Sequence, residues 1–165
     1  MDADILEELY QTHYTAAYSY CLTLCGQEAL AQDIVADAFV KAYLSLPDDI
    51  PSFRWWLLRV CRNLWFDHLR KEKHLAGSDA LEYLSDPATP ENRYIQKEQS
   101  RFLWHCIAAL PPGDREIITL HYFSGLPLKE IAAMTGASYP ALRQRMVRLR
   151  NQLKLQMEEH GYGSD

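Results

Sequence analysis

Residues 138–154 combine basic and polar side chains in a pattern that could read the edges of DNA bases. At about 100° per residue, Leu142, Met146, Leu149 and Leu153 fall on one face of a helix. The opposite face carries Arg143, Gln144, Val147, Arg148, Asn151 and Lys154. Arg pairs with guanine and Gln with adenine in the major groove, so this helix suits groove recognition. A solvated surface helix in a small bundle is the alternative interpretation.

A second candidate site lies in residues 52–71, where basic and aromatic residues alternate. Ser52–Leu57 and Arg62–Asp67 each combine Arg with Trp and Phe. Aromatic faces stack on exposed bases while Arg and Lys follow phosphates, as single-strand binding requires. We expect Trp56 and Phe66 to belong to the core, because their spacing places them among the apolar positions.

Other patterns argue against an enzyme, a cofactor or a metal centre. The sequence has no Gly-rich phosphate loop and no His-Glu-x-x-His motif. Cys21 and Cys25 could share a helix face, but no nearby His or Cys completes a tetrahedral zinc site. We expect Cys21, Cys25, Cys61 and Cys106 to be buried thiols without disulfides.

The elements that must position these residues are helical, because no sustained period-2 alternation predicts strands. Helices are expected near 6–24, 28–46, 52–73, 92–110, 114–123 and 128–135, with a last one after Ser138. Gly26 offers a stop for the first of these helices and Ser52 an N-cap for the third, and Ile34, Ala38 and Tyr43 fall near one face of the second. Gly136 closes the short helix before Ser138, which completes a helix-turn-helix pattern. The fold class is all-α: two small helical domains, residues 1–74 and 99–160, joined by a flexible acidic linker at 75–98.

The charge is strongly segregated along the 165 residues, whose net charge is −5. Residues 51–74 hold six basic residues against two acidic ones, and residues 140–157 hold five basic residues and no acidic one. Local fields act within about 10 Å, so these basic segments matter more than the net charge. The acidic start is unlike a secretory signal, and polar residues interrupt the uncharged stretch Leu9–Gln27. We expect a cytoplasmic protein without membrane insertion.

The order of motifs resembles a bacterial sigma factor of the extracytoplasmic-function class, over about residues 7–157. Ala31–Tyr43 resembles the polymerase-clamp-binding helix of that family. Ser52–Leu57, Arg62-Asn63 and Asp67–Lys71 resemble its −10 promoter helix. Leu110-Pro111-Pro112 with Arg115, Gly125-Leu126 and Glu130-Ile131-Ala132 resemble its −35-binding domain.

The resemblance implies partners and site residues. The partners are core RNA polymerase, through its β and β′ subunits, promoter DNA and an anti-sigma factor. The residues expected at core polymerase are Gln32, Asp33, Asp37 and Lys41. The −10 contacts are expected from Arg54, Trp55, Arg59, Arg62, Asn63, Arg70 and Lys71. The −35 contacts are expected from Ser138, Arg143, Gln144, Arg145, Val147, Arg148 and Arg150, with Arg145 and Arg150 mostly on phosphates.

One alternative function remains open at this point. A stand-alone helix-turn-helix regulator would explain the second domain. It would leave Asp33, Asp37 and the Arg- and Trp-rich helix near 52–73 without a role. Footprinting with and without core polymerase distinguishes a stand-alone regulator from a sigma factor.

Overall fold

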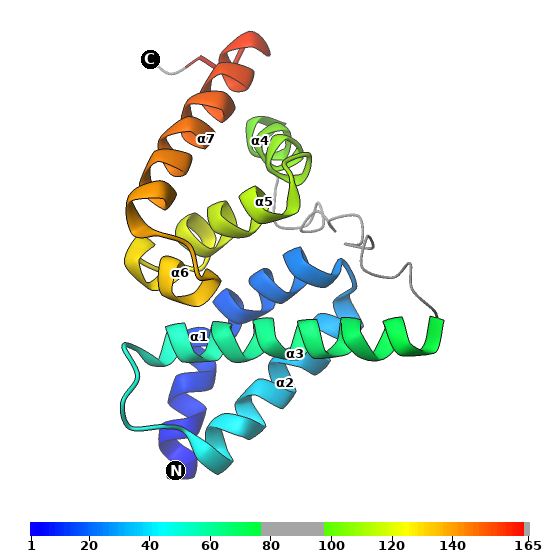
Figure 1. Cartoon of the computed structure of the whole chain (residues 1–165), viewed down its shortest axis with the longest axis vertical. Coiled ribbons are helices and arrows are strands. Elements are labelled where there is room, and N and C mark those ends of the chain that lie inside the picture. Colours follow the sequence, from blue (N-terminus) through cyan, green and yellow to red (C-terminus); the bar gives the residue numbers. More distant parts are fainter. Residues whose placement is uncertain (77–97, 164–165) are drawn as a thin grey trace. The chain divides into compact units, whose positions relative to one another are not determined.

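The computed structural model describes residues 1–76 and 98–163 of the chain. These residues contain seven α-helices and one π-helical turn (Figure 1). Those residues contain no strand, so the all-α prediction is confirmed. Most of the predicted linker, residues 77–97, lies outside the described residues. The chain divides into two compact units, Met1–Ala88 and Thr89–Asp165.

Helix α1 (Ala3–Cys25) has a capping residue at each end. The Asp2 carboxylate accepts a 3.1 Å hydrogen bond from the Asp4 amide, which satisfies one of the free N–H groups of the first turn. Gly26 ends the helix with φ of 71° and donates its N–H to the Leu22 carbonyl at 2.8 Å. A glycine adopts this left-handed conformation without steric cost, so the predicted stop is confirmed.

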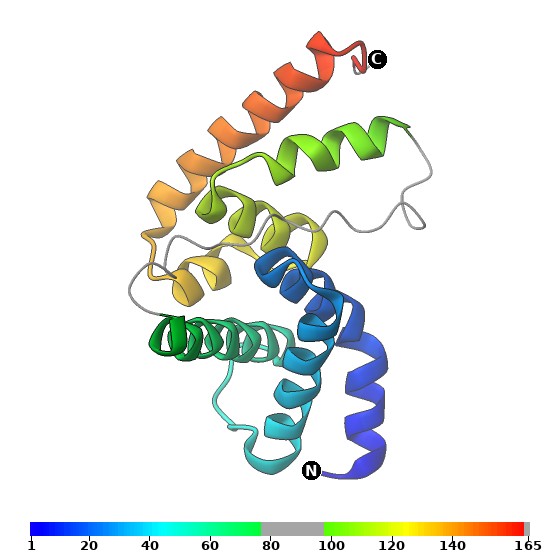
Figure 2. The same cartoon turned by 90° about the vertical axis from the view of Figure 1, so that its right-hand side faces the viewer.

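Helices α2 (Glu28–Ser45) and α3 (Phe53–Ala76) complete the first unit. Leu46 is extended because it precedes Pro47, and α2 therefore ends there. The Ser52 hydroxyl accepts a 3.1 Å hydrogen bond from the Trp55 amide and so caps α3 as predicted. Helix α3 crosses both α1 and α2 (Figures 1 and 2). Its first turns are consequently buried over four consecutive positions, Trp55–Leu58.

The second unit begins with α4 (Glu98–Ala108) and α5 (Pro112–Ile118). Helix α5 starts at Pro112, slightly earlier than predicted, because proline is well suited to a first helical turn. Arg115 is buried and its guanidinium donates a 3.2 Å hydrogen bond to the Ala108 carbonyl at the end of α4. Burial lowers the pKa of Arg115.

A π-helical turn, η2 (Thr119–Phe123), continues directly from α5. Its defining bond runs from the Ser124 amide to the Thr119 carbonyl at 2.9 Å, one residue wider than an α-helical bond. The widened turn leaves Thr119 and Leu120 buried while Tyr122 and Phe123 remain about half exposed. The sequence period predicted a helix here but not this change of register.

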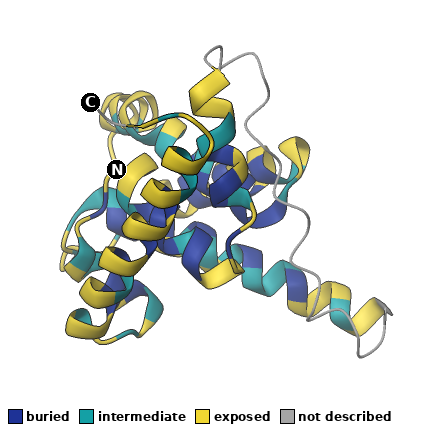
Figure 3. Cartoon of the chain, turned by 90° about the horizontal axis from the view of Figure 1, so that it is seen from above, coloured by how far each residue is buried: buried dark blue, intermediate teal, exposed yellow. Residues whose placement is uncertain are grey.

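Helices α6 (Leu128–Thr135) and α7 (Tyr139–Glu159) form the predicted helix-turn-helix. Gly136 closes α6 with φ of 75°, and the Ser138 hydroxyl accepts a 3.2 Å hydrogen bond from the Ala141 amide. The core side chains of α7 are the four predicted from spacing, Leu142, Met146, Leu149 and Leu153. Figure 3 colours the chain by burial and shows helices that are buried on one side and exposed on another.

Candidate functional site

The outer face of α7 presents the residues predicted to read DNA. Arg143, Gln144 and Arg148 are exposed, and Val147 is 55% exposed beside them. Arg150 and Ser138 are exposed as well, and the Ser138 hydroxyl serves as the helix cap. A helix with one buried stripe and an Arg-rich exposed face can enter the major groove.

Tyr139 joins this face, although the sequence analysis did not select it. The Arg143 guanidinium lies 5.7 Å from the centre of the Tyr139 ring. The Lys129 ammonium of α6 lies 5.6 Å from the same ring. Attraction between a cation and an aromatic ring therefore links α6 and α7 at the start of the exposed face. The turn between the helices brings Lys129 to this ring, and the period of neither helix predicts a contact between the two residues.

Arg145 is placed differently from the prediction. It was expected to contact phosphates, but its guanidinium pairs with the Asp114 carboxylate of α5 at 2.5 Å. The Arg145 side chain is 37% exposed and the Asp114 side chain only 12%. Arg145 is thus paired with an acid inside the unit, and the phosphate contact expected of it stays a prediction.

Helix α3 brings most of the second candidate set together. The helical period places Arg59, Asn63 and Arg70 along one stripe, and all three are exposed. The Arg59 guanidinium lies 5.2 Å from the Trp55 ring centre, and that of Arg62 lies 4.7 Å from the Phe66 ring centre. Arg70 forms an ion pair with Asp67, and Lys71 is exposed.

Two members of that set do not join the exposed stripe. Trp55 is only 8% exposed, so its ring is part of the core beneath Arg59 and is not an open stacking surface. Trp56 is also buried, as predicted, and Phe66 is partly buried. Arg54 points instead toward α1, where its Nε donates a 3.2 Å hydrogen bond to Nδ1 of His13. Burial and the Arg54 charge lower the pKa of His13.

Helix α2 carries a surface that mixes acids with apolar side chains. The predicted residues Gln32, Asp33, Asp37 and Lys41 are all exposed. Asp33 and Asp37 continue along the same stripe into Val40 and Leu44, which are 55% and 73% exposed. Tyr43 was expected near the buried residues Ile34 and Ala38, but it is exposed beside this stripe. Exposed apolar side chains next to charged ones are typical of protein interfaces.

The four cysteines are buried and free of disulfides, as predicted. A hydrogen bond with Cys61 and burial raise the pKa of the Cys21 thiol well above its usual value. Burial likewise raises the pKa of Cys25 and Cys106. Thiols in this state are poor nucleophiles and poor metal ligands.

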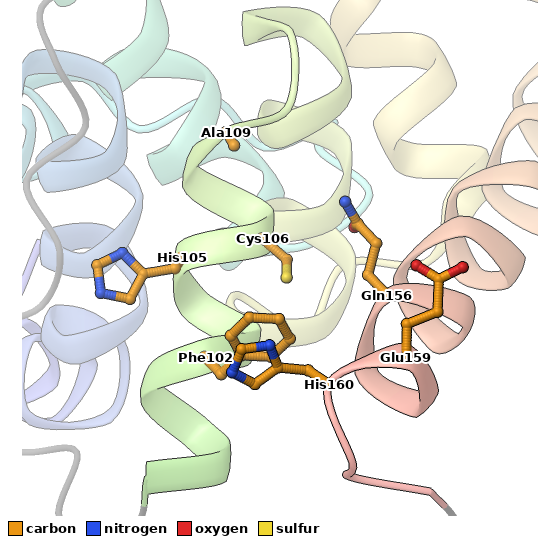
Figure 4. A pocket seen from close by; sticks show the side chains of 7 residues that line it. All are labelled: Phe102, His105, Cys106, Ala109, Gln156, Glu159 and His160. Atoms are coloured by element: carbon orange, nitrogen blue, oxygen red, sulfur yellow. The ribbon is translucent and has the colours of Figure 1, made fainter.

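A groove of about 360 Å³ lies between α4 and α7 in the second unit. Figure 4 shows the residues that line it, which are Phe102, His105, Cys106, Ala109, Gln156, Glu159 and His160. The Phe102 and His160 rings stack at 3.9 Å between centres.

No helix in the described ranges 1–76 and 98–163 has the length and apolar character to cross a membrane.

Comparison with known proteins places these two units in one family. The family models for Sigma-70 region 2 and Sigma-70 region 4 match residues 9–75 and 102–153. The ECF RNA polymerase sigma factor SigW of Bacillus subtilis is 28% identical, with the alignment covering 96% of this chain and 91% of SigW. For SigM of the same organism, also an ECF RNA polymerase sigma factor, the identity is 28% and the coverage is 90% and 93%.

A solved structure agrees with these sequence relatives. The sigma factor RpoE, in complex with the anti-sigma factor NepR from Bartonella quintana, has the same fold with a TM-score of 0.70. The identity is 23%, and the match covers 95% of this chain and 98% of RpoE. With regions 2 and 4 both present in the expected order, the chain belongs to the sigma-70 family as a sigma factor of the extracytoplasmic-function (ECF) class.

Proposed function

We propose that α7 reads the −35 element of promoters, α3 binds and melts the −10 element, and α2 docks on core RNA polymerase. The observation that carries this proposal is the exposed face of α7, where Arg143, Gln144 and Arg148 stand opposite a fully buried apolar stripe. The cap at Ser138 fixes where that helix begins, and recognition helices contact base edges with their first turns.

The surface of α3 supports the role in melting. Arg59, Asn63, Arg70 and Lys71 are exposed on a helix whose aromatic residues are largely enclosed. The basic side chains of such a surface can hold the phosphates of a separated DNA strand, while Asn63 can hydrogen-bond a flipped-out nucleotide base. The buried position of Trp55 assigns it a supporting role, in which its ring holds the Arg59 guanidinium by a cation–π contact.

Docking on core polymerase is assigned to the stripe that runs from Asp33 to Leu44. Acids at one end suit basic residues on a polymerase helix, and Val40 and Leu44 supply the apolar area that an interface needs at its centre. The β and β′ subunits are the proposed partners, and the clamp helices of the polymerase are the proposed contact for this stripe.

We further propose that an anti-sigma factor controls this chain, as the complex of RpoE with NepR suggests. An inhibitor that covers the α2 stripe would exclude core polymerase without touching the DNA-binding residues. The test is to isolate the tagged chain from its native cells and then add purified core polymerase. Release of a bound protein in proportion to holoenzyme formation supports the proposal, and simultaneous binding of both contradicts it.

Run-off transcription tests the main proposal. Purified chain and core polymerase are incubated with genomic fragments, including the DNA upstream of the gene for this chain. Discrete transcripts that need both proteins are expected. Footprints that form without core polymerase, and transcripts that do not need the chain, would instead indicate a stand-alone helix-turn-helix regulator.

A further inference from the structure

The contact between Asp114 and Arg145 joins two helices of the second unit at one point. Nε and Nη2 of Arg145 both lie 2.5 Å from Oδ1 of Asp114. Asp114 belongs to the first turn of α5 and Arg145 to the second turn of α7, 31 positions later. The Asp114 side chain is only 12% exposed, so the loss of Arg145 would leave a nearly buried carboxylate without its ion-pair partner.

Gly113 makes the close approach of this guanidinium possible. A Cβ atom at position 113 would lie only 2.9 Å from Nη2 of Arg145. The guanidinium therefore lies against the backbone at the start of α5, where a larger residue would force it to shift. The planar fork of Arg fixes direction as well as distance, which the single ammonium of Lys does not.

The position of Arg145 on α7 gives this contact its importance. Arg143 and Gln144 precede it directly, and Arg148 follows one turn later. On the other side, Leu142 and Met146 are buried in the core. A rotation of α7 about its axis would carry the exposed side chains away from the DNA bases that they are proposed to contact. The apolar contacts alone permit small rotations, because they are non-directional.

We propose that the Asp114–Arg145 ion pair sets the rotation and angle at which α7 meets the −35 element. Asp114 is then a positioning residue for DNA recognition although it is acidic. Arg145 contributes its geometry to recognition and does not neutralise a phosphate. This inference rests on the proposed role of α7 in −35 binding and adds residues that determine its specificity.

The experiment is a promoter-library selection with holoenzyme, in which the −35 positions are randomised. The variants are Asp114→Asn, Arg145→Gln and the double variant, and Arg150→Gln is the matched control on the exposed side of α7. Preference is read as the enrichment ratio between sequences, which does not depend on the fraction of active protein. A general loss of stability therefore leaves this ratio unchanged.

We expect Asp114→Asn to lower the −35 preference at least about fivefold, the lower end of the effect of losing one base contact. The double variant should lose no more than Asp114→Asn alone, because both changes remove the same contact. Arg150→Gln should keep the preference and lower the salt slope of promoter binding by about one. Arg145→Gln should leave that slope unchanged.

The opposite result is also specific. If Asp114 has no positioning role, Asp114→Asn only removes a negative charge, and binding to every sequence becomes tighter with the preference intact. That result overturns the inference, as does a salt slope lowered by one in Arg145→Gln. If Asp114→Asn folds poorly, the double variant supplies the same test without a buried unpaired charge. Wild-type holoenzyme without any −35 preference would overturn the proposed function, and this inference with it.

Discussion

Nε of Arg54 donates a 3.2 Å hydrogen bond to Nδ1 of His13, which ties the start of α3 to the middle of α1. The bond requires that Nδ1 carry no proton, and the His13 ring also lies 5.1 Å from the Phe53 ring. Burial and the adjacent Arg54 charge both favour neutral imidazole, so the pKa of His13 is lowered. The contact is thus sensitive to acid.

The first prediction concerns the pH dependence of stability. Because the folded-state pKa of His13 lies below the unfolded value, the unfolded chain binds a proton first as the pH falls. His13 therefore reduces the free energy of unfolding from about pH 6.5 downward, until the folded form is protonated too. Denaturant unfolding followed by tryptophan fluorescence at pH 8 to 5 measures this.

His13→Gln is the matched variant, because its amide oxygen can still accept the hydrogen bond and does not titrate. We expect the wild type to lose more stability than His13→Gln over this pH range. Parallel curves for the two proteins would show that His13 has no part in the pH dependence.

The second prediction concerns core binding. Asp33→Arg with Asp37→Arg should abolish binding to core polymerase, because like charges then face the basic clamp surface. The exposed pair Glu7 and Glu8 on α1 allows the same change of charge as a control. Circular dichroism should show unchanged helicity in both double variants. Equal affinity of the two variants for core in a pull-down would remove the α2 assignment.

The third prediction separates melting from simple attachment to DNA. Asn63→Ala should impair open-complex formation on duplex promoters more than on pre-melted ones, since unstacking a base costs a few kcal/mol. The control Lys71→Ala removes an exposed charge from the same helix and should give equal defects on both templates. An equal defect for Asn63→Ala on the two templates would argue against a role in melting.

The fourth prediction distinguishes base reading from phosphate contact on α7. Arg143→Ala should change the preferred −35 sequence, at a cost of about 1–3 kcal/mol at one base position. Arg150→Ala should lower transcription from all promoters without changing the preference. A promoter-library selection compares the two, and an unaltered −35 consensus in Arg143→Ala would show that the exposed face is wrongly assigned.

The fifth prediction concerns the turn of the helix-turn-helix. Gly136→Ala should destabilise the second unit by about 1 kcal/mol, because φ of 75° is unfavourable for a residue with a Cβ although the surrounding space is open. Gly163→Ala also meets no neighbour and has no left-handed φ, so it should be neutral. Calorimetry of the full chain measures both, and similar melting curves for the two variants would contradict the argument.

The local features of the fold could be predicted from the sequence, because their causes lie within a few residues. Ser52, Ser138, Gly26 and Gly136 act at the helix ends where their chemistry predicted them. The buried stripe of α7 likewise follows from its period alone. The π-helical turn Thr119–Phe123 could not be predicted, because a 3.6-residue period assumes a constant register.

The contacts of the candidate site depend on packing between distant positions. Arg145 has the sequence context of a phosphate contact, and only the fold brings Asp114 to it. Arg54 similarly pairs with a residue 41 positions away. Trp55 is adjacent to basic residues, yet α1 and α2 enclose the first turns of α3. In each case a partner from another helix decides whether the side chain is available to DNA.

The three cysteines of the first unit can report when that unit opens. Cys21, Cys25 and Cys61 have no exposed surface, so an alkylating reagent reaches them only when the first unit opens. Mass spectrometry of partly labelled protein would therefore give the opening rate of this unit in the intact chain. Bound core polymerase should slow the labelling, which gives a measure of engagement without an introduced probe.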